Sequence, residues 1–140
     1  MQKARILLVE DELIVAAELA ERLRNVGHEV VAVSSTGASA VASAAKHQPD
    51  VVLMDIRLKG SMDGIEAARR IRASWGTPIV FTTAHADEAT LQRAKEVKPL
   101  GLVMKPFADG QLEIAIEIAM HMQSVNGPHE TGLPIDVMTS

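Results

Sequence analysis

Five short aliphatic runs recur along this chain, and each is followed by a longer stretch with helical spacing of its apolar residues. The runs occupy residues 5–10, 29–34, 51–55, 78–83 and 101–105. Short, nearly continuous apolar runs predict strands that are buried on both faces. Strands that alternate with helices predict parallel βαβ units in one sheet covered on both sides. The chain is therefore expected to form a single α/β domain.

The segments between the runs predict five helices. The first has an apolar face of Leu13, Ala16, Ala17, Ala20 and Leu23, and Gly27 stands where a helix-ending glycine belongs. The other helix faces contain Val41, Ala44 and Ala45; Ile65, Ala68 and Ile71; Leu91, Ala94 and Val97; and Leu112, Ile116 and Ala119. Aromatic residues make up only 2% of the chain, so the core must be aliphatic.

Composition excludes several classes of protein. The 140 residues include no cysteine, which rules out disulfides, thiolate catalysis and cysteine zinc sites. A formal net charge of -4 argues against a nucleic-acid-binding face. No segment approaches the ~20 apolar residues of a membrane span, and the N-terminal apolar run is too short for a signal peptide. These features predict a cytoplasmic domain without membrane or nucleic-acid partners.

Polar residues follow four of the five predicted strands. Glu10 and Asp11 end the first, Asp55 the third, Thr83 the fourth and Lys105 the fifth. In an open parallel sheet, ligands bind outside the carboxyl ends of the strands, where the strand order reverses. Three carboxylates, a hydroxyl and an ammonium are therefore expected to converge at one edge of the sheet.

Each of these residues also has a simpler interpretation. Asp11 could cap the following helix, Asp55 could mark a strand end, and Lys105 could be a solvated surface lysine. Chance is a weaker explanation for the whole set, because four strand ends would each have to supply a matching polar residue. Clustered carboxylates are costly without a cation, and carboxylate oxygens suit Mg²⁺. With a lysine and a hydroxyl nearby, the set is typical of phosphoryl transfer, in which a carboxylate can be the nucleophile.

The motifs ILLVEDE, VVLMDIRL, MDGIEAARRIR, PIVFTTAHAD and GLVMKPF together resemble the receiver domain of two-component response regulators, over about residues 4–122. The resemblance implies a flavodoxin-like (βα)5 fold with a five-stranded parallel sheet of order 2-1-3-4-5. It implies that Asp55 accepts a phosphoryl group from a histidine kinase or a histidine phosphotransferase. It also implies a Mg²⁺ or Mn²⁺ ion held by Glu10, Asp11, Asp55 and the backbone carbonyl of Arg57.

The resemblance assigns further roles. Thr83 matches the hydroxyl that binds the transferred phosphoryl group, Lys105 matches the lysine that pairs with it, and the bond to Pro106 is expected to be cis. Arg57 and His85 match positions that modulate the lifetime of the phosphoryl group. His85 could equally be an ordinary residue on the approach to a helix. In this reading the domain catalyses only its own phosphorylation and dephosphorylation and is not a metabolic enzyme.

Two positions depart from the common receiver pattern. The aromatic residue usual three positions before the lysine is Leu102 here, so either another element reports phosphorylation or the conformational change is small. The loop of residues 57–62 is longer than usual and lacks proline, which predicts greater mobility. It also brings Arg57 and Lys59 toward the expected site.

Several functions compete with a phosphoacceptor receiver that signals by protein contact. The chain could be a receiver from a hybrid histidine kinase, a phosphate shuttle or a pseudo-receiver that only binds a partner. A phosphohydrolase would want a second acid two residues after the nucleophile, where Arg57 stands, and a flavin carrier would not want acidic residues after the first strand. Residues 1–122 are predicted to form the receiver domain. Residues 123–140 are predicted to be a flexible tail or the start of a linker, without an output domain.

The last predicted helix is apolar around most of its circumference. A surface helix needs an apolar stripe only a little over ~100° wide. Ile114, Ile118 and Met122 lie outside such a stripe, which predicts a second apolar surface for a homodimer or another partner. The alternative is that the tail or a wide core contact covers these three residues.

Overall fold

The computed structural model describes residues 3–85, 87–108 and 110–125. Strands and helices alternate throughout. Their order is β1 (Arg5–Val9), α1 (Leu13–Asn25), β2 (Glu29–Ser34), α2 (Gly37–His47), β3 (Val51–Asp55), α3 (Gly64–Trp75), β4 (Ile79–Thr83), α4 (Glu88–Glu96), β5 (Gly101–Met104) and α5 (Gln111–Val125). Among the described residues, no helix combines the length and the apolar character needed to cross a membrane.

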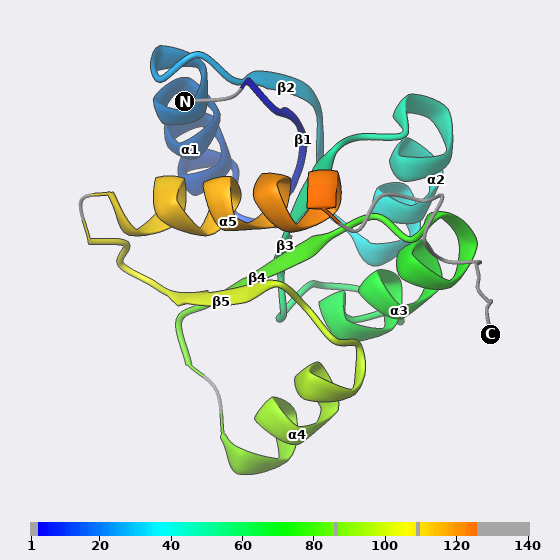
Figure 1. The fold of residues 1–140 in the computed structure, drawn as a ribbon. Coiled ribbons are helices and arrows are strands. Elements are labelled where there is room, and N and C mark those ends of the chain that lie inside the picture. The colour runs from blue at the N-terminus through cyan, green and yellow to red at the C-terminus, as the bar shows by residue number, and fades with distance from the viewer. Residues whose placement is uncertain (1–2, 86, 109, 126–140) are drawn as a thin grey trace, which may run out of the picture.

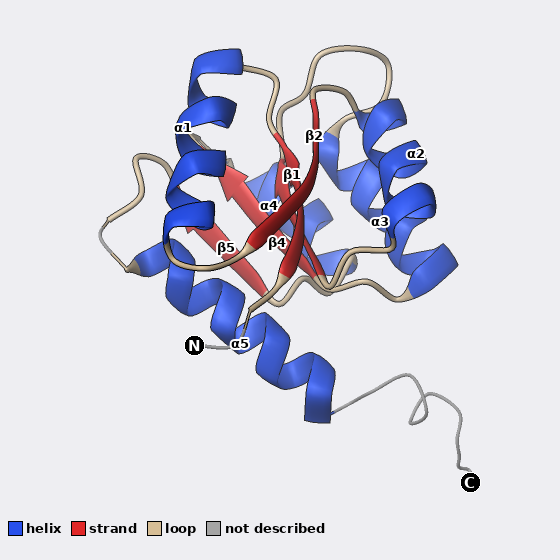
Figure 2. Cartoon of the chain, turned by 90° about the horizontal axis from the view of Figure 1, so that it is seen from above, coloured by secondary structure: helices blue, strands red, loops and turns tan. Residues whose placement is uncertain are grey.

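The strands form one parallel sheet of order β2-β1-β3-β4-β5. Helices α1 and α5 cover one face, and α2, α3 and α4 cover the other (Figures 1 and 2). This arrangement confirms the predicted flavodoxin-like fold and its strand order. The order reverses between β1 and β3, so the carboxyl ends of these two neighbouring strands mark the switch point of the sheet.

Two aliphatic layers account for the continuous apolar runs. Every residue of β3 and β4 is buried, because these strands lie inside the sheet with helices on both sides. Along β3, Val52 and Met54 pack toward α2 and α3, whereas Val51 and Leu53 pack toward α1 and α5. Side chains alternate between the two faces of a strand, so a strand between two helical layers must be apolar at every position.

The turn into α3 is built by two neighbouring residues next to the end of β3. The Asp63 side chain caps the helix by accepting the backbone N–H of Glu66 at 2.9 Å. A Cβ at Gly64 would overlap the backbone carbonyl of Asp55, so only glycine lets α3 start this close to β3. Gly27 has φ 102° just after α1, as the helix-ending glycine was expected to.

Some predicted core residues are on the surface. Ala17 and Ala45 are exposed, and Leu13 is 76% exposed. Leu13 lies in the first turn of α1, where no neighbouring layer covers the helix, and α1 instead buries Ala16, Leu19, Ala20 and Leu23. Helix α5 continues to Val125, three residues beyond the predicted boundary at residue 122. The rest of the predicted tail, residues 126–140, lies outside the described part of the chain.

Candidate functional site

Three carboxylates meet at the switch point of the sheet. Glu10 and Asp11 follow β1, and Asp55 is the last residue of β3, the strand paired directly with β1. One oxygen from each of the three side chains lies within 4.8 Å of the others. The sheet therefore brings together the acidic residues that the sequence placed in one site.

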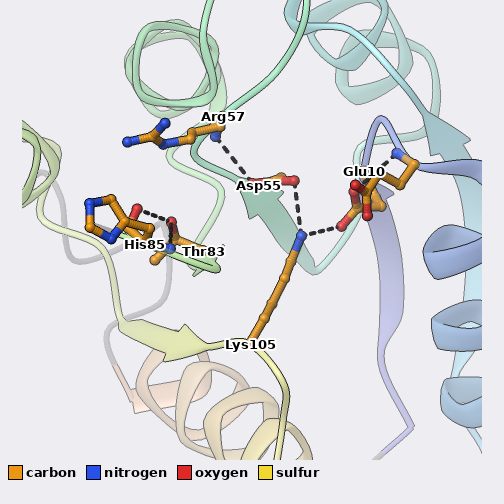
Figure 3. A network of polar contacts seen from close by, with 7 residues as sticks. Glu10, Asp55, Arg57, Thr83, His85 and Lys105 are labelled. Carbon is orange, nitrogen blue, oxygen red and sulfur yellow. Dashed lines mark hydrogen bonds and ion pairs between the residues drawn. The ribbon is translucent and has the colours of Figure 1, made fainter. Parts of the chain in front are cut away.

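Lys105 joins two of these carboxylates (Figure 3). Its Nζ donates to Oε1 of Glu10 at 2.6 Å and to Oδ2 of Asp55 at 3.1 Å. The Glu10 residue is only 3% exposed and Asp55 only 5% exposed, so these are buried ion pairs. One ammonium among three carboxylates leaves the site with excess negative charge, which favours a further cation.

The other oxygens of the two buried carboxylates accept backbone N–H groups. Glu10 accepts the N–H of Glu12 at 3.1 Å, and Asp55 accepts the N–H of Arg57 at 3.1 Å. Asp11 is not the cap of α1, because the N-cap residue is Glu12, whose side chain makes no capping hydrogen bond. The simpler structural role considered for Asp11 is therefore absent, and its carboxylate belongs to the acidic cluster.

Burial raises the pKa of Asp55 to about 6. The hydrogen bond and the charge of Lys105 oppose this rise, and the nearby Glu10 carboxylate adds to it. The pKa of Lys105 is raised, because its bonds to Glu10 and Asp55 outweigh the opposing effect of burial. Lys105 is thus held as a cation between the two carboxylates.

The donor set suits a hard divalent cation. Three carboxylates and an exposed edge that admits water are what Mg²⁺ or Mn²⁺ requires. Each carboxylate oxygen has two lone pairs, so the bonds already made leave Glu10 and Asp55 able to ligate. Glu10, Asp11 and Asp55 would hold the ion.

The raised pKa of Asp55 predicts a pH-dependent cost of folding. Because the pKa of Asp55 in the folded state, about 6, lies above the ordinary aspartate value of 3.8, protonation of Asp55 stabilises the folded state. The stabilisation that protonated Asp55 gives the folded state is fully present below about pH 4 and is lost as the pH rises through about 6. In EDTA, Asp55→Asn should therefore raise the free energy of unfolding by about 2 kcal/mol at pH 7.5 and by much less at pH 4. Urea unfolding of both proteins at the two pH values measures this, and equal differences at both would contradict it.

Thr83 is fully buried at the end of β4, and its hydroxyl is bonded to the loop that follows. The Oγ1 atom donates to the carbonyl of His85 at 2.8 Å and accepts the N–H of His85 at 3.3 Å (Figure 3). The backbone carbonyl of Thr83 accepts the N–H of Lys105 at 2.8 Å, but among the described hydrogen bonds the Thr83 hydroxyl makes none to Asp55 or Lys105. Thr83 lies at the end of β4, as the sequence predicts, but in this structure its hydroxyl bonds to the backbone of His85.

Arg57 and His85 lie on the side of the site away from Glu10 (Figure 3). Both are exposed, and both contribute to lowering the pKa of Asp87, an effect caused chiefly by the backbone N–H of Thr90. A guanidinium and an imidazole from different loops therefore stand near the first turn of α4. Lys59, by contrast, forms a backbone bridge to Thr36 before α2.

Two further features expected from the resemblance concern β5 and the residue after it. The bond between Lys105 and Pro106 is cis, as expected. Leu102 is half-buried and packs against the apolar cluster beneath α3 and α4. An aliphatic side chain packed against the core thus stands where most receivers have an aromatic ring.

An apolar groove that the sequence did not predict lies beside the site. A cavity of about 530 Å³ lies between α1 and the loop after β5. Its lining includes Val15, Leu19, Arg22, Lys105, Pro106 and Phe107. Ile14, on the first turn of the same helix, is 84% exposed. Helical periodicity could not have found this surface, because apolar residues at the start of α1 read as core.

Known proteins resemble this chain over the region that contains the site. The family model of the response regulator receiver domain matches residues 6–117. The transcriptional regulatory protein PdtaR of Mycobacterium tuberculosis is 38% identical over 116 residues, which cover 83% of this chain and 56% of PdtaR. The phyllosphere-induced regulator PhyR of Methylorubrum extorquens is 29% identical over 84% of this chain and 44% of its own length. The chain thus spans about half the length of these relatives.

A solved structure agrees with these matches. The signal receiver domain of a modulated diguanylate cyclase from Desulfovibrio desulfuricans superposes with a TM-score of 0.85 and 39% identity, over 89% of this chain and 99% of that one. The match to the family model contains β2 to β5, all of β1 except Arg5, and each of the acidic, hydroxyl and lysine residues of the site. The chain therefore belongs to the response regulator receiver domain family.

Proposed function

We propose that this domain accepts a phosphoryl group on Asp55 from the phosphohistidine of a histidine kinase or a histidine phosphotransferase, and signals through protein contacts. The observation that carries the proposal is the buried network of Lys105, Asp55 and Glu10 beside Asp11. This network combines a nucleophile, a fixed cation and a set of metal ligands. The chain also retains every residue whose loss would indicate a pseudo-receiver.

The transfer forms one bond and breaks another. An oxygen of the ionised Asp55 carboxylate attacks the phosphorus, the O–P bond forms as the N–P bond breaks, and the released imidazole nitrogen takes a proton from solvent. Attack of water on the acyl phosphate later returns the carboxylate and releases inorganic phosphate. A bound Mg²⁺ or Mn²⁺ supplies charge neutralisation for the phosphoryl oxygens.

The protein residues would position and stabilise the group that arrives. Lys105 would keep its charge beside the phosphoryl oxygens because its pKa is raised. The carbonyl of Arg57 would complete the metal ligands, since its own N–H is already fixed to Asp55. Thr83 would donate to a phosphoryl oxygen after leaving the carbonyl of His85, which would couple phosphorylation to the loop before α4.

Arg57 and His85 are proposed to influence how long the phosphoryl group persists. Their exposed side chains lie on the open side of the site, where water would approach. His85→Ala should change the rate of dephosphorylation several-fold, measured by following intact mass after removal of the donor. An unchanged rate would limit His85 to its backbone bonds with Thr83.

The groove beside Lys105 is proposed to receive the protein that donates the phosphoryl group. It adjoins the acceptor through Lys105, and the exposed Ile14 directly precedes Val15, which lines it. Ile14→Glu should slow transfer from a phosphohistidine protein by about tenfold. Burying a carboxylate at an apolar contact costs at least the roughly 1.4 kcal/mol of binding free energy that corresponds to this factor. Transfer from a small phosphodonor should stay the same. Equal slowing with both donors would instead indicate damage to the site.

Intact-mass measurement tests the proposed function directly. After incubation with phosphoramidate and Mg²⁺, the chain should gain one phosphoryl group, and EDTA should prevent the gain. Phosphoramidate has the P–N bond of phosphohistidine but needs no docking surface, so the assay is independent of the partner. If no gain occurs with donor and Mg²⁺, the pseudo-receiver interpretation replaces this one.

A further inference from the structure

His28 is a buried histidine at the junction of α1, β1 and β2. It stands between the end of α1 and the start of β2 and is only 4% exposed. Its backbone N–H donates to the carbonyl of Leu23 in α1 at 3.1 Å, and the next N–H, of Glu29, donates to the carbonyl of Ala4 at 2.9 Å. The backbone thus fixes His28 on two sides, at the end of the sheet opposite the carboxylates.

The ring of His28 accepts a hydrogen bond, which determines where its proton lies. Nδ1 accepts the backbone N–H of Ala4, directly before β1, at 3.0 Å. A neutral imidazole has one donor and one acceptor nitrogen, so Nδ1 carries no proton and Nε2 carries one. An imidazolium, with a proton on both nitrogens, could not accept this bond. The hydrogen bond to Ala4 therefore exists only while His28 is neutral.

Two buried side-chain atoms lack a hydrogen-bond partner within the described part of the chain: Nε2 of His28 and Oε1 of Glu113. Glu113 lies in the first turn of α5, and its other oxygen, Oε2, pairs with Nε of Arg22 in α1 at 3.2 Å. Among the charged groups that act on the His28 ring, the Glu113 carboxylate favours protonation most strongly. A donor and an acceptor, both buried and both unsatisfied, thus belong to one electrostatic cluster between α1, α5 and the start of the sheet.

The packing of α5 keeps Glu113 on this flank. Leu112 and Ile116 are fully buried against the sheet. Three other side chains of the helix are exposed, so the core does not cover the apolar surface predicted for it from Ile114, Ile118 and Met122. A rotation that turned Glu113 away from α1 would expose the buried residues, so the carboxylate stays near the junction.

We propose that His28 is a proton switch with two alternative partners, the backbone of Ala4 and the carboxylate of Glu113. In the neutral state, Nδ1 accepts the N–H of Ala4 and holds the start of β1. When Nδ1 takes a proton from solvent, both ring nitrogens become donors, the bond to Ala4 breaks, and the Nε2–H turns to Oε1 of Glu113. Each state satisfies a buried group that the other state leaves unpaired.

The surroundings of the ring set the pH at which the switch operates. Burial lowers the pKa of His28, and the amino group of the chain lowers it further, whereas Glu113 and Glu117 of α5 oppose this change. Because the pKa in the folded state lies below the ordinary value of 6.5, the stabilisation by the bond to Ala4 is fully present above about pH 7 and is lost as the pH falls below 6.5. Phosphorylation plays no part in this inference.

An NMR titration of the full chain tests the switch. It uses the Asp55→Asn variant, which lacks the other buried group that titrates near pH 6. Between about pH 8 and pH 5, the amide signal of Ala4 should move with the same midpoint as the ring signals of His28, and this midpoint should lie below 6.5. An Ala4 signal that stays in place while the ring titrates would overturn the proposal, as would a ring that remains neutral throughout.

Two glutamine variants test the second partner. Glu113→Gln should lower the midpoint of His28 by at least about half a pH unit, because the amide no longer attracts the proton. Glu117→Gln is the matched control, since it removes the same charge one turn further along α5, where the side chain is exposed, and it should have a smaller effect. Equal effects of the two variants, or no effect of Glu113→Gln, would exclude Glu113 as the partner of the protonated ring.

His28→Asn separates the ring from other titrating groups. The Oδ1 atom of asparagine can replace Nδ1 as the acceptor for Ala4, but it takes no proton in this pH range. The Ala4 signal should therefore lose its titration between about pH 8 and pH 5. An unchanged titration in this variant would assign the movement of Ala4 to another group and overturn the proposal. The midpoints of the ring and of Ala4 test the switch even if this variant does not fold.

Discussion

Asp55→Asn is expected to abolish phosphorylation of the chain by phosphoramidate in the presence of Mg²⁺. An amide has no anionic oxygen that can attack phosphorus and form an acyl phosphate. The variant should nevertheless fold, because Asn matches Asp in size and its carbonyl can still accept the N–H of Arg57 or a bond from Lys105. Intact-mass measurement should show one added phosphoryl group on the wild type and none on the variant.

Asp50→Asn is the matched control for this experiment. Asp50 lies next to the other end of β3, where its Oδ2 accepts the backbone N–H of Arg5 at 2.9 Å. An amide oxygen can replace this acceptor, and the site lies at the opposite edge of the sheet. The control should be phosphorylated like the wild type. Phosphorylation of Asp55→Asn to the wild-type level would move the acceptor to another residue.

Lys105→Met is expected to have the largest effect on stability. It removes the ammonium that donates to Glu10 and Asp55, two carboxylates whose residues are 3% and 5% exposed. Breaking a buried ion pair leaves uncompensated charge, so the free energy of unfolding in EDTA should fall by about 3 kcal/mol. Mg²⁺ should restore much of this loss. Urea unfolding followed by circular dichroism, with and without Mg²⁺, measures both changes.

The same substitution should strengthen metal binding while it slows phosphorylation. Without the ammonium, Glu10, Asp11 and Asp55 attract a cation more strongly, so the dissociation constant for Mg²⁺ should fall about tenfold in calorimetric titration. Lys95→Met, on the exposed surface of α4, should change neither quantity. Weaker Mg²⁺ binding by Lys105→Met would show that the lysine organises the carboxylates rather than competing with the metal.

The sequence determined the fold because its signals are local. Continuous apolar runs and helical spacing specify which segments are strands and helices, and parallel sheets constrain how such segments connect. Polar residues at four strand ends then locate the site, because the carboxyl ends of parallel strands share one edge. The placement of Asp55 beside Glu10 and Asp11 follows from this rule without coordinates.

Only the tertiary structure determined the hydrogen-bond partner of each polar group in the site. The Nζ of Lys105 lies between Glu10 and Asp55, residues 95 and 50 positions away in the chain. The hydroxyl of Thr83 bonds the backbone of His85 instead of facing Asp55. Leu13 has the spacing of a core residue yet is exposed, because burial depends on whether another layer reaches that turn. Such outcomes depend on packing between distant segments, which periodicity within one segment does not encode.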